Sequence, residues 1–97
     1  MKVVWSDEAK ITYDDTIDGL LKKWHIEIAI DFEDKTNDLL DRLKINKKLC
    51  PPSKVKKLRK CVIHKNASLI YRIKSNAIEL VTFVDNRTQP QLLIFKL

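Results

Sequence analysis

The sequence predicts an α+β fold: an N-terminal strand, an antiparallel helical hairpin and a three-stranded antiparallel meander complete one twisted sheet. Two patterns predict it. Residues 7–46 repeat apolar side chains at helical spacing, whereas residues 67–85 alternate with the period of a strand. We expect one domain over residues 1–97, which includes an apolar C-terminal extension at residues 88–97.

The first half of the chain predicts a strand and two helices. Lys2-Val3-Val4-Trp5 has the composition of a short strand, and Ser6 then caps a helix whose first turn is acidic. We expect this helix to bury one stripe of residues: Ala9, Tyr13, Ile17, Leu20, Leu21 and Trp24. A break near Trp24-His25 precedes a second helix from Glu27 to about Asn46. Its expected buried face comprises Ile28, Ala29, Phe32, Thr36, Leu39, Leu40 and Leu43.

The second half predicts a loop and three strands. Residues 47–57 read as a loop because Pro51-Pro52 cannot continue a helix, and a strand then leads into a hairpin with a Ser75-Asn76 turn. In this register Ile73 faces Ile78, Tyr71 faces Leu80 and Leu69 faces Thr82, all on a buried face. The opposite face pairs Arg72 with Glu79 and is expected to be half exposed, with Lys74, Ile70, Val81 and Phe83 around the pair. We expect a functional site on this second face.

Charge is distributed unevenly along the chain. Residues 1–41 contain eleven acids and five lysines, whereas residues 42–78 contain twelve lysines and arginines and no acid. Such basic density favours a polyanion, nucleic acid above all, or an acidic protein as partner. The alternative interpretation is a solvated lysine-rich surface that only aids solubility.

The two cysteines do not form a recognisable ligand motif. Cys50 and Cys61 have neither companion cysteines nor a ligand-spaced histidine pair, and we expect no zinc site and no cofactor. The N-terminus has no signal-peptide design and no apolar run reaches 18 residues, which favours a cytoplasmic protein. In that reducing compartment we expect both cysteines to be packing thiols and not a disulfide.

Several segments resemble the RelE/ParE family of bacterial toxins from type II toxin–antitoxin modules. They are Val4-Trp5-Ser6-Asp7-Glu8-Ala9, the acidic helical hairpin, Leu58-Arg59, Leu69-Ile70-Tyr71-Arg72-Ile73 and Phe83-Val84-Asp85-Asn86-Arg87. The resemblance implies a small basic toxin that a cognate antitoxin neutralises. RelE-like members cleave messenger RNA in the ribosomal A site, and ParE-like members inhibit DNA gyrase.

The chemistry of the two activities separates them. Metal-free RNA cleavage needs a base, an acid and cations that stabilise the phosphorane. The cations expected to bind a target or phosphate are Lys54, Lys56, Lys57, Arg59, Lys65, Arg72 and Arg87. In RelE-like nucleases an arginine often begins the strand equivalent to Leu69–Ile73, and a Tyr or His acts near the C-terminus. This chain has Ser68 at the first position and no Tyr or His within residues 88–97.

These departures favour ParE-like gyrase inhibition over the alternative, a ribosome-dependent endoribonuclease. A second alternative is an inactive toxin that is retained as a binding module. If the chain is a nuclease, the candidate catalytic residues are Arg87, Arg59 and His64, although a lone strand histidine is more often structural. Tyr71 is interpreted as a core residue, and Arg72 with Glu79 as a cross-strand pair. The expected partners are an acidic amphipathic antitoxin helix, gyrase or the ribosome, and a second copy in a homodimer or heterotetramer.

Overall fold

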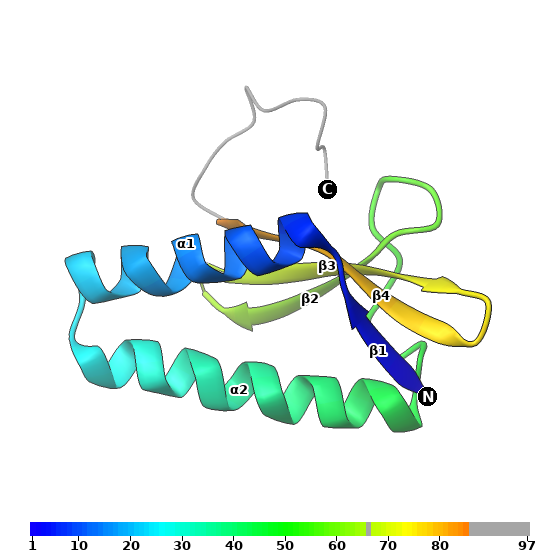
Figure 1. Cartoon of the computed structure of the whole chain (residues 1–97), viewed down its shortest axis with the longest axis horizontal. Helices are drawn as coiled ribbons and strands as arrows, with labels where there is room; N and C mark the ends of the chain where they lie inside the picture. Colours follow the sequence, from blue (N-terminus) through cyan, green and yellow to red (C-terminus); the bar gives the residue numbers. More distant parts are fainter. Residues whose placement is uncertain (66, 86–97) are drawn as a thin grey trace.

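The structure is a computed structural model, and it describes residues 1–65 and 67–85. The elements follow in the order β1 (Lys2–Trp5), α1 (Asp7–Lys23), α2 (Ile26–Ile45), β2 (Arg59–His64), β3 (Ala67–Lys74) and β4 (Ala77–Asp85). The strands form one sheet in the order β1-β4-β3-β2, in which β1 runs parallel to β4 and the other pairs are antiparallel (Figure 1). The predicted α+β class and order of elements are confirmed. The apolar extension at residues 88–97 lies outside the described residues.

The start of α1 is tied to the sheet by its N-cap. The Ser6 hydroxyl accepts a hydrogen bond from Ala9 N–H at 3.0 Å and donates one to the Val81 carbonyl at 2.9 Å. One side chain therefore satisfies a helix N-terminal amide and also fixes where the helix leaves the sheet. The helix ends at Lys23, one residue before the predicted break.

The core lies between the sheet and the two helices. Its most deeply buried side chains come from both layers: Ala9, Phe32, Leu43, Leu69, Tyr71, Ile78 and Leu80. Leu21 and Trp24, by contrast, are 45% and 42% exposed, so the predicted α1 stripe is wrong at its C-terminal end. The last turns of α1 extend beyond the strands, where no sheet is present to cover them (Figure 1). There Lys65 lies over the Trp24 ring, 5.5 Å from its centroid.

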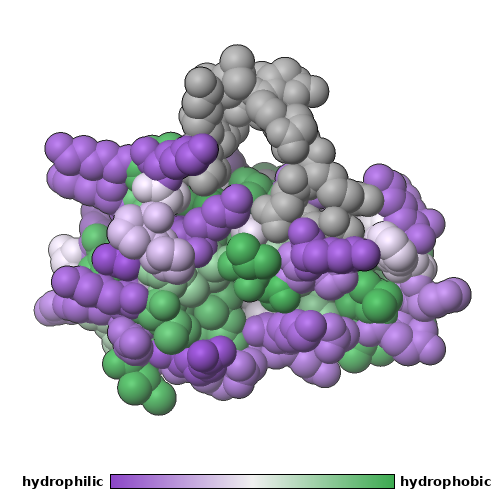
Figure 2. Space-filling model, turned by 180° about the vertical axis from the view of Figure 1, so that it is seen from behind, coloured by the Kyte–Doolittle hydropathy of each residue, from purple (hydrophilic) through white to green (hydrophobic). Residues whose placement is uncertain are grey.

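Some apolar side chains remain on the surface. Val62 on β2 is 68% exposed and Ile45 at the end of α2 is 89% exposed. On the side seen from behind, hydrophobic surface lies among groups of hydrophilic side chains (Figure 2). Within the described residues, neither helix is long and apolar enough to cross a membrane.

The β3–β4 hairpin confirms part of the predicted register and corrects the rest. Ile73 pairs with Ile78, Arg72 with Glu79 and Tyr71 with Leu80, as predicted. Leu69, however, pairs with Phe83 and not with Thr82, because β4 has a β-bulge: Val81 is an extra residue opposite the step from Ile70 to Tyr71. A bulge adds one residue to one strand and moves the following side chains to the opposite face.

The bulge turns Phe83 into the core. Its ring lies 5.1–6.3 Å from those of Trp5, Tyr13 and Phe32, and Phe83 is buried. The prediction that Phe83 belongs to the half-exposed face is therefore wrong. Ile70, also expected on that half-exposed face, is fully buried.

The two cysteines form a disulfide, which contradicts the expectation of packing thiols. Cys50 and Cys61 are bonded, with their Cα atoms 5.3 Å apart. The chain folds back along β2, where Lys60 N–H donates to the Pro51 carbonyl at 3.1 Å and Pro52 bridges to Arg59. This return brings Cys50 beside Cys61 at a separation that suits a disulfide.

Candidate functional site

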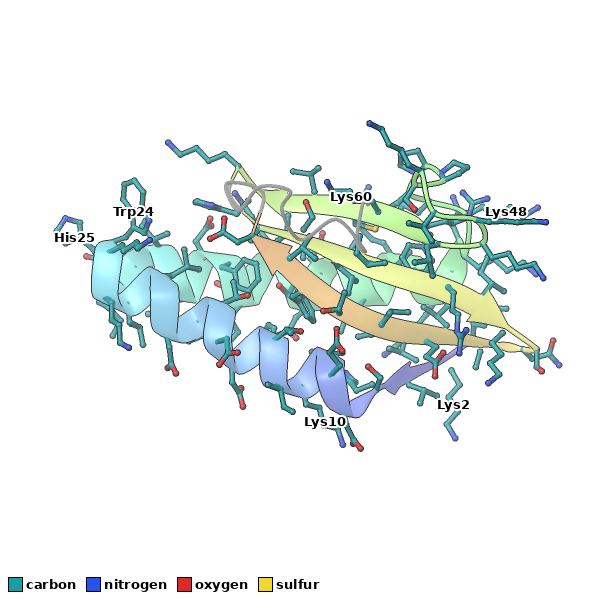
Figure 3. All side chains as sticks on the ribbon, turned by 90° about the horizontal axis from the view of Figure 1, so that it is seen from above. Lys2, Lys10, Trp24, His25, Lys48 and Lys60 are labelled. Atoms are coloured by element: carbon teal, nitrogen blue, oxygen red, sulfur yellow. A yellow bond between two sulfur atoms is a disulfide. The ribbon has the colours of Figure 1, made fainter. Side chains whose placement is uncertain are left out.

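The sheet face opposite α2 carries most of the charge that the sheet presents. We call it the outer sheet face. The register places on it Lys2, Val4, Lys60, Val62, Arg72, Lys74 and Glu79. Four of these residues are basic and one is acidic. Figure 3 looks onto this face from above, with α2 behind the sheet and Lys60 beside β2.

Arg72 and Glu79 form a cross-strand ion pair on the outer sheet face. Arg72 Nε donates to Glu79 Oε1, and the two side chains are 43% and 25% exposed. Such a partly exposed pair contributes about 0.2–1 kcal/mol, so its main effect is to orient the guanidinium. A guanidinium has five N–H donors and this bond uses one, which leaves Arg72 able to contact an anion at the same time.

Residues 46–58, which we call the lysine loop, connect α2 to β2 and hold five lysines: Lys47, Lys48, Lys54, Lys56 and Lys57. Ser53 organises the turn, because its N–H donates to the Leu58 carbonyl at 2.8 Å and its hydroxyl accepts from Val55 N–H at 3.1 Å. Lys57 has φ 67°, in the left-handed region. The predicted loop is confirmed, and Lys54, Lys56 and Lys57 are exposed on it.

Arg59 and Tyr71 hold the base of the lysine loop from the helix side of the sheet. Arg59 Nη1 donates to the Cys50 carbonyl at 2.7 Å. The Tyr71 hydroxyl donates to the Lys47 carbonyl at 2.8 Å and accepts from Cys50 N–H at 3.5 Å. Burial raises the pKa of Tyr71, while the Cys50 hydrogen bond and Arg59 oppose that rise. The interpretation of Tyr71 as a core residue is confirmed, and a binding or catalytic role for Arg59 stays a prediction.

The candidate catalytic and binding residues are divided between two ends of the sheet. His64 ends β2 and Lys65 follows it beside the start of β3, whereas Arg72 lies five residues farther along β3. At the rise of a strand, five residues span about 17 Å. Lys65 lies over the Trp24 ring at the helical tip. Arg87 lies outside the described residues.

Two basic residues of the outer sheet face are missing from the sequence-based site. Lys60 pairs with Ile70, and Lys2 on β1 pairs with Ala77 of β4. The alternation of side chains along a strand could have identified Lys60. Lys60 and Val62 flank the buried Cys61 and must therefore point to the opposite face of the sheet. Nothing in the sequence indicates that β1 pairs with β4.

Comparison with known proteins rests on solved structures. No family model matches the sequence, and no curated protein matches it. The chain is similar to a structure of a chromosomal ParDE toxin–antitoxin system from P. aeruginosa, with TM-score 0.66, 20% identity, and coverage of 88% of this chain and 95% of that one. A copper-bound mutant toxin from Helicobacter pylori gives TM-score 0.66, 18% identity and coverage of 90% and 96%.

A third structure, the YoeB/ParE toxin from Agrobacterium tumefaciens, gives TM-score 0.64, 17% identity and coverage of 88% and 98%. The TM-scores of 0.64–0.66 establish that the folds are shared. The chain has the fold of RelE/ParE-type toxins, over nearly the full length of the proteins compared.

Proposed function

We propose that this chain is the toxin of a type II toxin–antitoxin module and that it acts by binding a protein target, with DNA gyrase preferred. The fold supports a toxin, since the similar structures are described as ParE and YoeB toxins. The outer sheet face and the lysine loop supply the basic surface by which it binds. Both occupy the acid-free stretch of residues 42–78, apart from Lys2, Val4 and Glu79.

One observation carries the preference for binding over catalysis: the candidate base and cations that lie within residues 1–65 and 67–85 do not converge. A general base must come within about 3 Å of the proton that it removes, directly or through one water. His64 and Arg72 are separated by most of the length of β3, and Arg59 is bonded to the Cys50 carbonyl. Residues 88–97 contain no Tyr or His that could serve as the terminal acid.

The surface chemistry supports an acidic amphipathic antitoxin helix as the neutralising partner. Lys2, Lys60 and Lys74 share the outer sheet face with apolar side chains, of which Val4 and Val62 are 37% and 68% exposed. An apolar stripe on the partner would cover the valines while its acids pair with the lysines. Because opposite potentials steer association, affinity should fall as salt concentration rises. An affinity that is unchanged between low and high salt would contradict this mode of binding.

The test is controlled expression of the chain in a sensitive bacterium, with labelled thymidine and leucine incorporation followed separately over the first minutes. We expect DNA synthesis to stop first, and purified chain to inhibit gyrase supercoiling in vitro. Charge reversal by Lys60→Glu with Lys74→Glu should relieve both effects. Arg42→Glu is the matched control, since Arg42 is an exposed α2 residue that contacts only Asp38 among the described salt bridges. No inhibition of gyrase at stoichiometric excess would refute the preferred target.

The ribonuclease alternative has its own support in the dense cations of the lysine loop. It requires an early stop in leucine incorporation and ribosome-dependent A-site cleavage detected by primer extension. Cleavage should then disappear in Arg87→Ala. A chain that leaves growth and both incorporations unchanged when expressed without antitoxin would favour the inactive binding module.

A further inference from the structure

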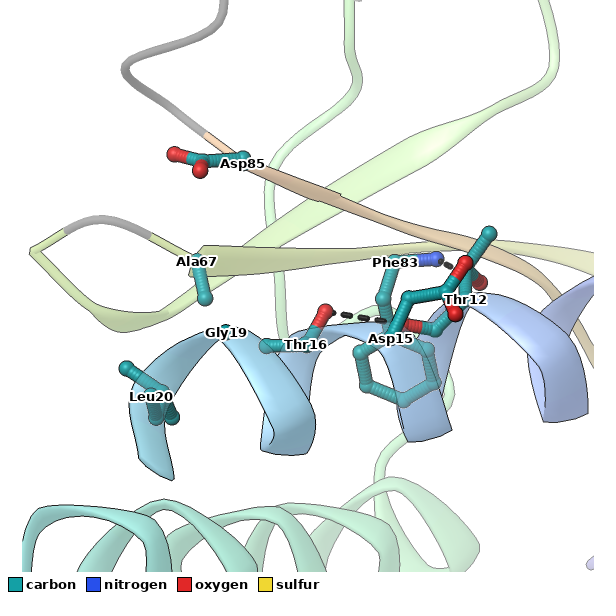
Figure 4. Close-up of a pocket in the computed structure, with 8 residues that line it drawn as sticks. All are labelled: Thr12, Asp15, Thr16, Gly19, Leu20, Ala67, Phe83 and Asp85. Carbon is teal, nitrogen blue, oxygen red and sulfur yellow. Dashed lines mark hydrogen bonds between the residues drawn. The ribbon is translucent and has the colours of Figure 1, made fainter. Parts of the chain in front are cut away.

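An acidic cleft lies between α1 and the ends of β3 and β4. It has a volume of about 310 Å³. Its floor is apolar, because Leu20, Ala67 and Phe83 line it and each is at most 5% exposed. Asp15 of α1 and Asp85 at the end of β4 also line it, and both are exposed (Figure 4).

The cleft exists because α1 replaces β1 beside β4. β1 ends at Trp5, and the next part of the β4 edge faces α1, where the Thr12 hydroxyl accepts a hydrogen bond from Phe83 N–H at 2.9 Å. Farther along α1 comes Gly19, which lines the cleft. A Cβ at Gly19 would meet no atom of the described part of the chain within 4 Å, and the φ of Gly19 is not positive. Neither packing nor backbone conformation therefore requires glycine, which costs a helix about 1 kcal/mol relative to alanine. Its effect on the structure is to leave the cleft open.

The hydroxyl groups of the cleft have their donors occupied by the helix. Thr12 Oγ1–H donates to the Glu8 carbonyl and Thr16 Oγ1–H donates to the Thr12 carbonyl, both at 2.8 Å. Thr12 Oγ1 already accepts from Phe83 N–H and from the Thr82 hydroxyl, so of these two hydroxyls Thr16 Oγ1 is the one that can accept a hydrogen bond from a ligand. The carboxylate of Asp15 is an acceptor as well, and Asp85, which already has a partner, lines the cleft beside it. The side chains that line the cleft thus combine hydrogen-bond acceptors, negative charge and an apolar floor.

We infer that this cleft binds an alkyl cation, a guanidinium or ammonium group on an aliphatic stem. The stem would cover Leu20, Ala67 and Phe83, and the cation would donate to the carboxylate of Asp15 and to Thr16 Oγ1. Arginine and lysine side chains bury their stems on apolar surface in this way. The site is opposite in charge to the outer sheet face and does not depend on the proposed toxin function.

The test follows backbone amide resonances of the uniformly labelled full chain during titration. The probe is N-acetyl-arginine methylamide, and the matched control is its citrulline counterpart, which has nearly the same shape but no charge. We expect saturable shifts at Thr16, Gly19 and Phe83 with arginine, at roughly millimolar Kd for one side chain, and none with citrulline. Equal shifts with both probes, or no saturable shift with arginine, would overturn the inference.

Three variants locate the binding. Asp15→Asn should weaken arginine binding roughly two- to fivefold, the range for a partly exposed ion pair, whereas Asp18→Asn on the same helix should leave it unchanged. Gly19→Leu should abolish binding with the helical circular dichroism intact, because leucine favours a helix and its side chain would enter the cleft. Binding that survives Gly19→Leu, or that both aspartate variants weaken equally, would refute the cleft as the site.

Putrescine then distinguishes the two sources of such a cation. Shifts at the same amides with putrescine would support the site for small diamines as well as for side chains. Shifts with arginine methylamide alone would support the site for a side chain of a partner polypeptide.

Discussion

The hydroxyl of Tyr71 gives the sharpest test of how the lysine loop is held. Tyr71→Phe removes one oxygen and keeps the buried ring. Two contacts are lost, the donation to the Lys47 carbonyl at 2.8 Å and the weaker acceptance from Cys50 N–H at 3.5 Å. A net hydrogen bond contributes about 0.5–1.5 kcal/mol, and an unpaired buried partner costs about 1–3 kcal/mol. Because the Lys47 bond is only partly buried, water can replace some of it, and we expect a total loss of about 1–2 kcal/mol.

Urea unfolding monitored by circular dichroism measures this loss, with the wild-type m-value retained. For a domain of this size the midpoint of thermal unfolding should fall by about 4–8 °C for each kcal/mol lost. Hydrogen exchange at the Cys50 amide should accelerate, because its acceptor has gone. Tyr13→Phe is the control, since within the described residues the Tyr13 hydroxyl makes no hydrogen bond. It should change stability by no more than about 0.5 kcal/mol. A Tyr71→Phe loss that is no larger than the control would refute the anchoring role.

Three further predictions concern the disulfide, the aromatic cluster and pH. Reduction of the Cys50–Cys61 bond should lower the unfolding free energy by about 2–4 kcal/mol, measured by urea unfolding with and without a dithiol. Phe83→Ala should cost about 3–5 kcal/mol in the same assay, because three aromatic rings surround Phe83. Burial raises the pKa of both Tyr13 and Tyr71 above the ordinary value of 10.0, so stability should be constant with respect to these groups below about pH 9. Above about pH 10 it should fall, because the unfolded tyrosines ionise first, and Tyr71→Phe should reduce that slope.

Each of these predictions has an outcome that contradicts it. For the disulfide, the intact mass of the untreated chain should be lower by two hydrogens than the mass of the reduced chain. An untreated mass equal to that of the reduced chain would show that both thiols are free and would exclude the disulfide. Val62→Ala is the control for Phe83, because Val62 is 68% exposed and should change stability by no more than about 0.5 kcal/mol. A Phe83→Ala loss as small as that would show that the ring is not in the core. For the pH dependence, a stability that falls more steeply above about pH 10 in Tyr71→Phe than in the wild type would contradict the prediction.

Local patterns were sufficient to predict where the helices begin and end. Ser6 was identifiable because an N-cap acts on the amide of a residue three positions away. The break near Trp24-His25 was placed within one residue of the end of α1 at Lys23. The Arg72–Glu79 pair also followed from local spacing, since a two-residue turn sets the register next to it. The same register failed at Leu69, once the bulge intervened.

The candidate site was only partly predictable. The basic loop and Arg72 follow from composition and strand parity, but the position of Lys2 depends on β1 pairing with a strand more than 70 residues away. The Cys50–Cys61 bond depends on the return of the chain along β2, and the acidic cleft on the point where α1 takes over the β4 edge.

The elements, their order, the α+β class and the separation of acidic and basic halves could all be read from local sequence patterns, because caps, periodicity and turns act over a few residues. The burial of Phe83 in the core, the meeting of the two cysteines and the placement of Asp15 and Asp85 along one cleft became visible only in the folded chain. These outcomes depend on contacts between residues distant in the chain, and a shift of one residue in a ladder is enough to reverse which face a side chain occupies.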